Sequence, residues 1–519
     1  MNIPESIIIA GGGTAGWMAA NLLQHAWPKT IITLVESAEI GVIGVGEGST
    51  PYLKTFFKNL GISDAEWMPK CNATYKAGID FSAWSETPGY KKYFHPFFSE
   101  LDIEPATSFF TNALAQRRGD AVYAHPDFHF VSTQIAKQYR APIPVRPLGH
   151  ELDYGYHFDS SLLGVFLKER AISLGLIRIE DTVINVELDA DGCISSLLTK
   201  INGEVKAEFF VDCTGFRSLL MGENLKVPFK SFKNNLVNNA AVAISTPLAD
   251  DMPIPSQTSS KALSHGWAWG IPLTNRFGNG YVYSDTHINA TDAEAEFRAH
   301  LNISGDADIT VKHLKMKVGR LEKHWHKNCL AVGLSQGFIE PLEATALMLT
   351  QYTIDSFIKC AGENVGSMTA VVAEKNREKF NGKINNVIEG IRDYIVTHYK
   401  LNSRSDSEYW REAREEIQIS NNLSALLSSW QKSGEEFEET LSVLKNNLIY
   451  HRASWYVILS GMGFFPRATL HNRLQHGRLQ HQRYTVSDPM GNRRIQQEIY
   501  CKEKAAILFP DHREFLLTM

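Results

Sequence analysis

The N-terminal part of the chain places a glycine-rich turn between two apolar runs. Ser6–Ala10 is the first run, residues 17–27 have the spacing of a helix, and residues 30–35 form the second run. Short, continuously apolar strands joined by a helix are typical of parallel strands that are buried on both faces. The pattern therefore predicts one βαβ unit at the start of the chain.

Two hairpins are predicted much further along, after a helix that Asp159 is expected to cap. Residues 183–188 alternate in polarity and lead to an Asp-Gly turn. Residues 194–201 lead to an Asn-Gly turn, from which residues 204–211 return as one strand. These segments predict a β-meander, inserted far downstream of the βαβ unit.

The glycine turn has the spacing of a dinucleotide-binding motif. Gly11, Gly13 and Gly16 lie between the predicted strand and helix, and Glu36 follows the last glycine by roughly 20 residues. One glycine makes the turn, one lets a pyrophosphate approach, and one lets the helix pack on the strand. The helix N-terminus binds phosphate and Glu36 binds a ribose hydroxyl, so we expect an ADP-containing cofactor. Residues 41–51, rich in glycine, are expected to form a strap against the ligand.

The later sequence changes to a helical pattern from residue 350 onward. Apolar side chains recur there at helical spacing, at Ile384, Val387, Ile388, Ile391 and Ile395. We therefore expect two parts. Residues 1–350 form a FAD-binding part with an interleaved substrate-binding sheet, and residues 351–519 form a mostly helical part. That the second part covers the substrate pocket is implied by the family resemblance described below.

Composition and charge narrow the class of protein. The 519 residues carry a net charge of −5 at pH 7, which argues against nucleic acid or an anionic membrane as the main partner. Six scattered cysteines form no CxxC pair, and no apolar run reaches the ~18 residues of a membrane span. The N-terminus also lacks the basic start of a signal peptide. We expect a cytoplasmic protein without disulfides.

Five histidines raise the question of a metal site: His324, His326, His471, His476 and His481. A spacing of five residues rotates a helical position by about 140°, so the last three do not share a face. Acidic partners are also absent from the cluster. The sequence predicts solvated histidines and no metal.

The segment Gly-Trp-Ala-Trp-Gly-Ile-Pro carries the most specific signal. Together with the three glycines it resembles the flavin-dependent halogenases, and within them the tryptophan-halogenase branch. The residues of the WxWxIP pattern are Trp267, Trp269, Ile271 and Pro272. The resemblance implies an α/β FAD-binding fold of the glutathione-reductase-like or PHBH-like kind, with an inserted β-meander and a mostly helical C-terminal part. In that family the two tryptophans are thought to shield the flavin side.

The resemblance also implies the roles of individual residues. It places the essential lysine at Lys76 and the substrate-proximal glutamate at Glu343, whereas Glu340 has a structural role. Substrate-facing positions fall on His95, Phe97, Tyr450 and Trp455. Cofactor-binding positions are Gly11, Gly13, Thr14, Ala15, Gly16, Glu36, Val45, Gly46, Glu47 and Leu334.

The reaction that the resemblance implies needs FAD as FADH2, supplied by a separate flavin reductase, together with oxygen and chloride or bromide. Hypohalous acid travels through the protein to Lys76, whose pKa burial would lower. The lysine hydrogen-bonds the oxidant or carries the halogen as a haloamine, and a small aromatic is then halogenated. The helix after Glu343 begins without an acid, so the N–H groups of Thr345 and Ala346 are expected to bind halide. The family is often homodimeric.

Two departures from the family pattern affect the expected substrate and halide. The family commonly reads Glu-Ser-Thr-Gly where this chain has Glu-Ala-Thr-Ala, with Ala344 and Ala346. An acid near Trp455 that would hold the ammonium group of free tryptophan is not evident. An indole or another electron-rich aromatic is therefore as good a candidate as tryptophan. A flavin monooxygenase that hydroxylates an aromatic, or a non-catalytic flavin-binding protein, are the alternatives.

Overall fold

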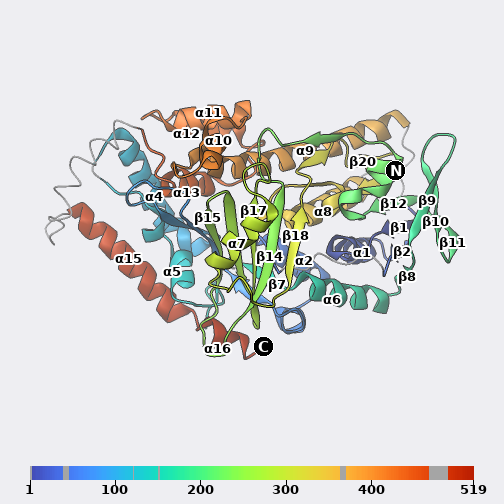
Figure 1. Ribbon diagram of the computed structural model, residues 1–519, viewed down its shortest axis with the longest axis horizontal. Coiled ribbons are helices and arrows are strands. Elements are labelled where there is room, and N and C mark those ends of the chain that lie inside the picture. The colour runs from blue at the N-terminus through green and yellow to red at the C-terminus, as the bar shows by residue number, and fades with distance from the viewer. Residues whose placement is uncertain (1–2, 39–45, 121, 150–151, 363–369, 467–488) are drawn as a thin grey trace. The chain divides into compact units, whose positions relative to one another are not determined.

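The computed structural model describes residues 3–38, 46–120, 122–149, 152–362, 370–466 and 489–519 (Figure 1). The chain divides into two compact units, each made of separate segments. Unit 1 comprises Met1–Ala73, Phe158–Lys233 and Lys315–Glu389, and unit 2 comprises Thr74–His157, Asn234–Leu314 and Gly390–Met519. The expected division at residue 350 stays a prediction.

Unit 1 is built on a six-stranded sheet with the order β20-β21-β12-β1-β2-β8. The central strand β1 pairs in parallel with both neighbours, so that Ile8 lies opposite Phe210 and Thr33. Its apolar side chains are buried, which explains the continuously apolar run. The strands are β1 (Ser6–Ala10), β2 (Ile31–Glu36), β8 (Ile177–Glu180), β12 (Phe209–Asp212), β20 (Trp325–His326) and β21 (Cys329–Ala331).

Three helices of unit 1 pack together beside this sheet, α1 (Thr14–Ala26), α6 (Ser160–Ser173) and α8 (Ala346–Gly362), with α1 in contact with the other two (Figure 1). The predicted cap of α6 is confirmed, because Asp159 Oδ1 accepts hydrogen bonds from the N–H groups of Ser161, at 2.9 Å, and Leu162, at 3.2 Å.

The predicted meander is present in unit 1, with one correction. Strands β9 (Val183–Leu188), β10 (Ile194–Thr199) and β11 (Gly203–Val205) form an antiparallel sheet that projects from the parallel one (Figure 1). The single return strand expected over residues 204–211 is wrong. The chain leaves the meander after Val205, and β12 joins the parallel sheet beside β1, because Phe209 and Phe210 are buried there.

The remaining elements of unit 1 are short. They are β3 (Glu47–Gly48), α2 (Tyr52–Leu60), α3 (Asp64–Trp67), β13 (Phe229–Ser231), β19 (Gly319–Leu321) and β22 (Gly337–Phe338), with the turns η1 (Pro69–Cys71), η4 (Gly215–Arg217), η5 (Leu219–Asn224), η6 (Gly333–Ser335) and η7 (Pro341–Glu343).

Unit 2 is built on a seven-stranded sheet with the order β18-β14-β17-β16-β15-β5-β6. Apart from the parallel β15–β5 pair, each pairing recorded between its strands is antiparallel. The strands are β5 (Gly78–Ser82), β6 (Lys92–Pro96), β14 (Ala240–Pro247), β15 (Gln257–Leu263), β16 (Gly266–Pro272), β17 (Arg276–Tyr283) and β18 (Val311–Lys315). Strand β4 (Thr74–Lys76) pairs with β7 (Gly155–Phe158), with Thr74 opposite His157 and Lys76 opposite Gly155.

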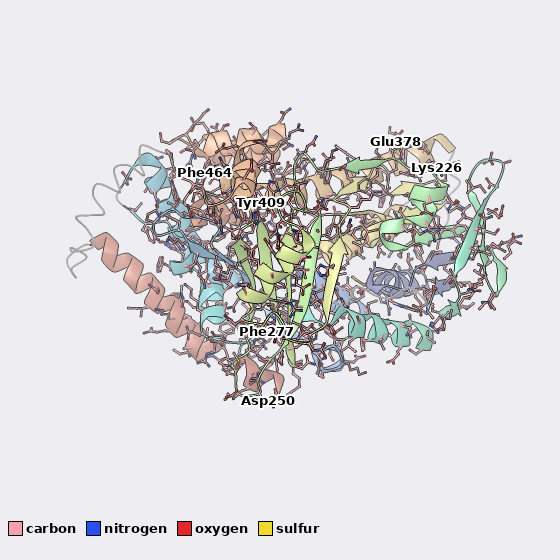
Figure 2. The ribbon with its side chains drawn as sticks, viewed as in Figure 1. Lys226, Asp250, Phe277, Glu378, Tyr409 and Phe464 are labelled. Atoms are coloured by element: carbon pink, nitrogen blue, oxygen red, sulfur yellow. The ribbon has the colours of Figure 1, made fainter. Side chains whose placement is uncertain are left out.

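Helices form the rest of unit 2. They are α4 (Ile103–Arg118), α5 (Val131–Lys137), α7 (Ala290–His300), α10 (Glu408–Glu415), α11 (Asn421–Trp430), α12 (Glu436–Leu444), α13 (Arg452–Gly461), α15 (Pro489–Leu508) and α16 (His512–Leu516), with the turns η2 (Glu100–Asp102) and η3 (Pro126–Phe128). The side chains are drawn in Figure 2, where Tyr409 is labelled. It is fully buried and donates a hydrogen bond to Asn238 at 3.0 Å.

The boundary between the units falls within the long helix α9 (Ala370–Leu401). The apolar stripe predicted for this helix is confirmed, since Ile384, Ile388, Ile391 and Ile395 are buried. The predicted change to helical structure is also confirmed, because after β22 every described helix or strand is a helix.

Candidate active site

The glycine turn of unit 1 has the geometry that the sequence predicts. Gly11 has a φ of +111°, and a Cβ atom there would lie 2.2 Å from the carbonyl oxygen of Cys213. A Cβ on Gly16 would lie 2.0 Å from the carbonyl oxygen of Gly11. Both positions therefore require glycine for a tight turn and for close packing of α1.

Gly13 differs from its neighbours because a Cβ there would meet no atom of the described residues within 4 Å. Gly13 lies directly before α1, and the first bond within the helix runs from Trp17 N–H to the Gly13 carbonyl, at 3.1 Å. The N–H groups of Thr14, Ala15 and Gly16 thus have no acceptor within the helix and are available to an anion. Open space beside these donors fits the pyrophosphate of FAD.

Glu36, the predicted ribose ligand, lies at the end of β2 beside the glycine turn. A Cβ on Gly12 would be 1.7 Å from Glu36 Oε2, so one carboxylate oxygen is close to the turn. Arg178 on β8 donates from Nε to the other oxygen, Oε1, at 2.6 Å. The sequence reasoning missed Arg178, whose contact depends on the pairing of β2 with β8. The ion pair orients the carboxylate that would accept the ribose hydroxyl.

The turn η6 brings Leu334 to the same end of α1. A Cβ on Gly333 would lie 2.6 Å from the Ala15 side chain and 3.9 Å from Thr350 Oγ1, so η6 lies between the first turn of α1 and the second turn of α8. The glycine turn predicted to bind the cofactor and the N-terminal part of α8 are thus neighbours within unit 1. Gly333 carried no recognisable motif in the sequence.

The predicted strap falls partly outside the described residues, including Val45. Gly46 and Glu47 are described, and Gly46 has a φ of +80°. Burial raises the pKa of the Glu47 carboxyl from 4.5 to about 7. A hydrogen bond with Ser160 opposes this shift and the charge of Asp159 adds to it. Glu47 is therefore a carboxyl that holds a proton close to neutral pH.

Glu343 ends a 3-10 turn rather than starting the following helix. Ala344 has a φ of +55°, in the left-handed region, and this residue ends η7 before α8 begins. Glu343 and Thr345 are buried, and the first turn of α8 contains no acid, as predicted. The first bond of the helix runs from Leu349 N–H to Thr345 O, at 2.9 Å. The positive end of the helix dipole is therefore not neutralised by a side chain of its own first turn.

Lys76 lies on β4 in unit 2 and is fully buried, which contradicts an ordinary surface role. Its partner position on β7 is Gly155, which has no side chain to fill the adjacent space. The ammonium nitrogen lies 5.4 Å from the centre of the Phe97 ring. Phe97 reaches this position because its N–H donates to the Ala77 carbonyl at 2.9 Å, where β6 pairs with β5.

All of the predicted substrate-facing residues except Phe97 contact Tyr394 of α9, which the sequence reasoning missed. Tyr394 Oη donates to the Ser454 carbonyl at 3.1 Å, so it accepts from His95 Nε2 at 2.9 Å. The Tyr394 and Tyr450 rings stack with 3.6 Å between centroids, and the Trp455 ring packs edge-on at 4.9 Å. Trp455 is fully buried and Tyr450 is partly buried. In the sequence, Tyr394 had no signal of its own beyond its place next to Ile395 of the apolar stripe of α9.

Trp267 and Trp269 on β16 point to one face, as predicted, with 6.1 Å between ring centroids. Both are buried. Trp269 lies over Gly280 of the neighbouring strand β17, where a Cβ would be 2.0 Å from the indole ring. Position 280 therefore requires glycine, and close packing on the sheet holds the two tryptophans in place.

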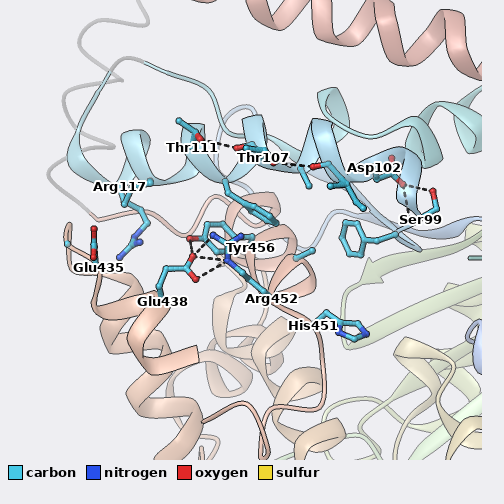
Figure 3. Close-up of a pocket in the computed structure, with 17 residues that line it drawn as sticks. Ser99, Asp102, Thr107, Thr111, Arg117, Glu435, Glu438, His451, Arg452 and Tyr456 are labelled. Carbon is cyan, nitrogen blue, oxygen red and sulfur yellow. Dashed lines mark hydrogen bonds and ion pairs between the residues drawn. The ribbon is translucent and has the colours of Figure 1, made fainter. Parts of the chain in front are cut away.

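A pocket of about 650 Å³ opens in unit 2, and residues next to Phe97 and Tyr450 in the sequence help to line it (Figure 3). Phe98, next to Phe97, forms part of its wall, and so does Arg452, which follows Tyr450 by two positions. Arg452 pairs with Glu438 and lies 4.0 Å from the centre of the Phe110 ring. The other walls include Ala106, Ala453 and Tyr456. Most of this lining is apolar, and the Arg452 charge is compensated by Glu438.

The prediction that all five histidines are solvated is wrong for His324, which is fully buried. It lies within hydrogen-bond distance of Asn385 Oδ1, at 2.9 Å, and burial lowers its pKa to about 3. His326 is partly buried, and His471, His476 and His481 lie outside the described residues. Among the described residues, no group of three metal-ligating side chains is close enough to hold a metal ion.

The glycine turn, the acid on β2 and the parallel sheet define a dinucleotide-binding flavoprotein fold. The family model described as tryptophan halogenase matches residues 6–476. The chain therefore belongs to the tryptophan halogenase family of flavin-dependent enzymes.

Several relatives are similar over most of their length. Tryptophan 6-halogenase SttH of Streptomyces toxytricini is 35% identical over 434 residues, covering 79% of this chain and 81% of the relative. Tryptophan 7-halogenase RebH of Lentzea aerocolonigenes is 32% identical, covering 89% and 90%. The crystal structure of SttH matches with a TM-score of 0.81 over 99% of this chain and 100% of that one. BrvH, a flavin-dependent halogenase from Brevundimonas sp. BAL3, matches with a TM-score of 0.81 at 30% identity, over 99% of each chain.

The family assignment makes the protein a flavin-dependent halogenase, and the predicted FAD-binding α/β fold is confirmed. It does not favour a hydroxylating monooxygenase or a non-catalytic flavin protein. Halogenases of this kind use FAD and a halide, act on a small aromatic and depend on a separate flavin reductase. Within the described part of the chain, no helix is long and apolar enough to cross a membrane.

Proposed function

We propose that this protein halogenates an indole or a related electron-rich aromatic with chloride or bromide, using Lys76 to deliver the halogen. The observation that carries the proposal is the complete burial of Lys76 against the Phe97 ring, in a chain of the halogenase family. Lysine side chains are almost never fully buried, so the burial of Lys76 sets it apart from the ordinary surface lysines.

The net reaction balances in two stages. When bound, FADH2 would supply two of the four electrons that oxygen accepts, and halide would supply the other two. In sum, halide, oxygen, FADH2 and one proton give hypohalous acid, water and FAD. Hypohalous acid and the aromatic then give the halogenated aromatic and a second water. The ring loses one proton and gains one halogen, so the protein must guide the oxidant and accept a proton.

Lys76 supplies the guidance in this proposal. Its ammonium group donates a hydrogen bond to hypohalous acid, or its neutral amine carries the halogen as a haloamine. The burial of the side chain limits the positions that the nitrogen can occupy. Phe97 contributes a ring face that stabilises the cationic form by ~0.5–2 kcal/mol.

Glu343 and the start of α8 carry the remaining roles in unit 1. We assign to Glu343 the orientation of the oxidant, and the stabilisation of the cationic ring or removal of its proton. The backbone N–H groups of Thr345 and Ala346 would bind the halide, since the first turn of α8 contains no competing acid. The methyl group of Ala346, where the family commonly has glycine, would then influence which halide is preferred.

The substrate side of the proposal lies in unit 2. His95, Phe97, Tyr450 and Trp455 would form or support an aromatic clamp, in which stacking contributes ~0.5–1.5 kcal/mol per pair. The pocket beyond Phe98 would hold a non-reacting substituent of the substrate. Its largely apolar lining and its compensated Arg452 charge favour a neutral, apolar substituent over a charged one.

The test combines the protein with FAD, a separate NADH-dependent flavin reductase, oxygen and either chloride or bromide. Indole, tryptophan and 3-alkylindoles are offered, and products are identified by mass spectrometry. We expect a halogenated indole whose formation requires halide. A hydroxylated product that forms without halide would instead identify a monooxygenase. Size-exclusion chromatography with light scattering tests the homodimer that the family resemblance suggests.

A further inference from the structure

A histidine of α16, His512, accepts a backbone hydrogen bond from β4, the strand that carries Lys76. Strand β4 pairs with β7 through one of its edges. The N–H group of its central residue, Tyr75, donates to His512 Nε2 at 3.1 Å. The imidazole thus takes the place that a neighbouring strand would occupy, and satisfies a buried backbone donor one residue from Lys76.

The tautomer of His512 follows from these contacts. A backbone N–H can only donate, so Nε2 must carry a lone pair and the ring proton must reside on Nδ1. Nδ1 lies 3.1 Å from the Ile254 carbonyl oxygen, which can only accept. The ring is therefore neutral with both nitrogens used, which agrees with a pKa lowered to about 4, mainly by burial.

A second neutral histidine contacts the side chain of Thr74, on the face of β4 that also carries Lys76. Thr74 Oγ1 donates to the Pro272 carbonyl at 2.7 Å, so it must accept from His157 Nδ1–H at 3.1 Å. His157 Nε2 then accepts from the Thr258 hydroxyl at 2.9 Å. Burial and the charge of nearby Lys76 lower the pKa of His157, which keeps the ring neutral. Thr74 and Lys76 are two positions apart on a strand and share a face.

The segment that carries His512 is anchored on both sides of that residue. The Ala141 N–H donates to the Pro510 carbonyl at 3.0 Å, and Arg513 Nε donates to the Met252 carbonyl at 2.6 Å. Phe515 packs 6.0 Å from the Tyr75 ring, between centroids. All these contacts lie within unit 2, so residues 510–519 form a rigid support behind β4.

We propose that residues 510–519, through His512, together with His157, position Lys76 for halogen transfer. Both histidines are positioning residues, since they contact the strand and not the reacting atoms. These contacts fix the position of the β4 backbone and therefore the position of the Lys76 nitrogen beside Phe97. This inference rests on the proposed role of Lys76. Loss of the support leaves oxidant formation in unit 1 intact but uncouples it from the aromatic.

The test measures halogenated indole formed per FADH2 consumed, and hypohalous acid released into solution by a chemical trap. In His512→Ala we expect the product ratio to fall by about tenfold to 10²-fold, the loss typical of a misplaced reactive group. Trapped oxidant should rise correspondingly, while the KM for indole and the affinity for FAD change less than about twofold. His512→Gln offers an acceptor and a donor at similar reach and should restore most of the ratio.

A folded His512→Ala variant with unchanged kcat and unchanged coupling would overturn the inference. If that variant does not fold, Thr258→Val, which removes only the donor to His157 Nε2, is compared with Thr258→Ser. Lower coupling in the valine variant alone supports the positioning role, and equal coupling overturns it. Failure of the proposed function looks different, because the unaltered protein would then yield no halogenated product at all.

Discussion

The Lys76 ammonium nitrogen lies 5.4 Å from the centre of the Phe97 ring, inside unit 2 and out of contact with solvent. The two residues are separated by a strand, a loop and a second strand, and the β5–β6 pairing brings them together. A ring face attracts a cation but donates no competing hydrogen bond. Phe97 can therefore hold the cationic lysine in place without itself donating a hydrogen bond to the site.

Replacing Lys76 by methionine should abolish regioselective product without preventing cofactor binding. Methionine preserves much of the side-chain volume, so the protein should fold, but it has no N–H donor. We expect halogenated indole to fall by at least ~10²-fold, an effect of the size seen when a donor in a catalytic site is removed. Trapped hypohalous acid should rise. Normal halogenation by this variant would refute the role of Lys76.

Replacing Gly13 by alanine should weaken FAD binding without affecting the fold. Within the described part of the chain, a Cβ at Gly13 meets no atom within 4 Å, so it would project into the space proposed for the pyrophosphate. We expect the Kd for FAD to rise by about tenfold or more, equivalent to ~1.4 kcal/mol. Flavin fluorescence titration measures it.

Gly16→Ala is the matched control for this prediction. Its Cβ would lie 2.0 Å from the Gly11 carbonyl oxygen, so the thermal midpoint should fall. Unchanged FAD affinity in Gly13→Ala would place the pyrophosphate elsewhere.

Glu47 should make the stability of the FAD-free protein depend on pH. Its pKa is raised from 4.5 to about 7 in the folded state, so between these values the folded state binds a proton that the unfolded state does not. The contribution of Glu47 to the free energy of unfolding is therefore greatest below pH 4.5, and it declines as the pH rises towards 7. The thermal midpoint of the unaltered protein, relative to Glu47→Gln, should decline across that window. A constant difference would contradict the shift.

Ala344 should be a position where glycine stabilises the protein. A φ of +55° is strained for alanine but not for glycine, and the strain amounts to ~1–2 kcal/mol before the entropy of glycine is subtracted. Ala344→Gly should raise the thermal midpoint. Ala346→Gly, two positions later in the first turn of α8, should lower it, because that residue is helical. A lower midpoint in Ala344→Gly would argue against the left-handed conformation.

Filling the pocket of unit 2 should change the preference among substrates more than it changes the rate at which indole is halogenated. Ala106→Leu adds a branched side chain to the lining that Ala106 shares with Phe98 and Arg452. For 3-alkylindoles of increasing length we expect KM to fall with length in the unaltered protein and to become independent of length in the variant. Indole itself should be halogenated equally by both. Equal length dependence would exclude the pocket as the substituent site.

The sequence by itself determined the local elements and the cofactor motif. The βαβ unit, the Asp159 cap, the meander turns and the stripe of α9 depend on local periodicity, capping and turn chemistry. Gly11, Gly13 and Gly16 lie close together in sequence, so their shared geometry was also predictable. The family pattern supplied Lys76 and Glu343, which residue spacing alone would not have selected.

Only the tertiary structure decided which distant residues act on those elements. Arg178 reaches Glu36 through strand pairing, Tyr394 gathers His95 and Tyr450, and His512 binds Tyr75 across more than four hundred residues of sequence. The burial of His324 and the departure of β12 from the meander also arose from long-range packing. Such contacts carry no local period, because their free energy comes from burial and from hydrogen bonds between segments that meet only in the folded chain.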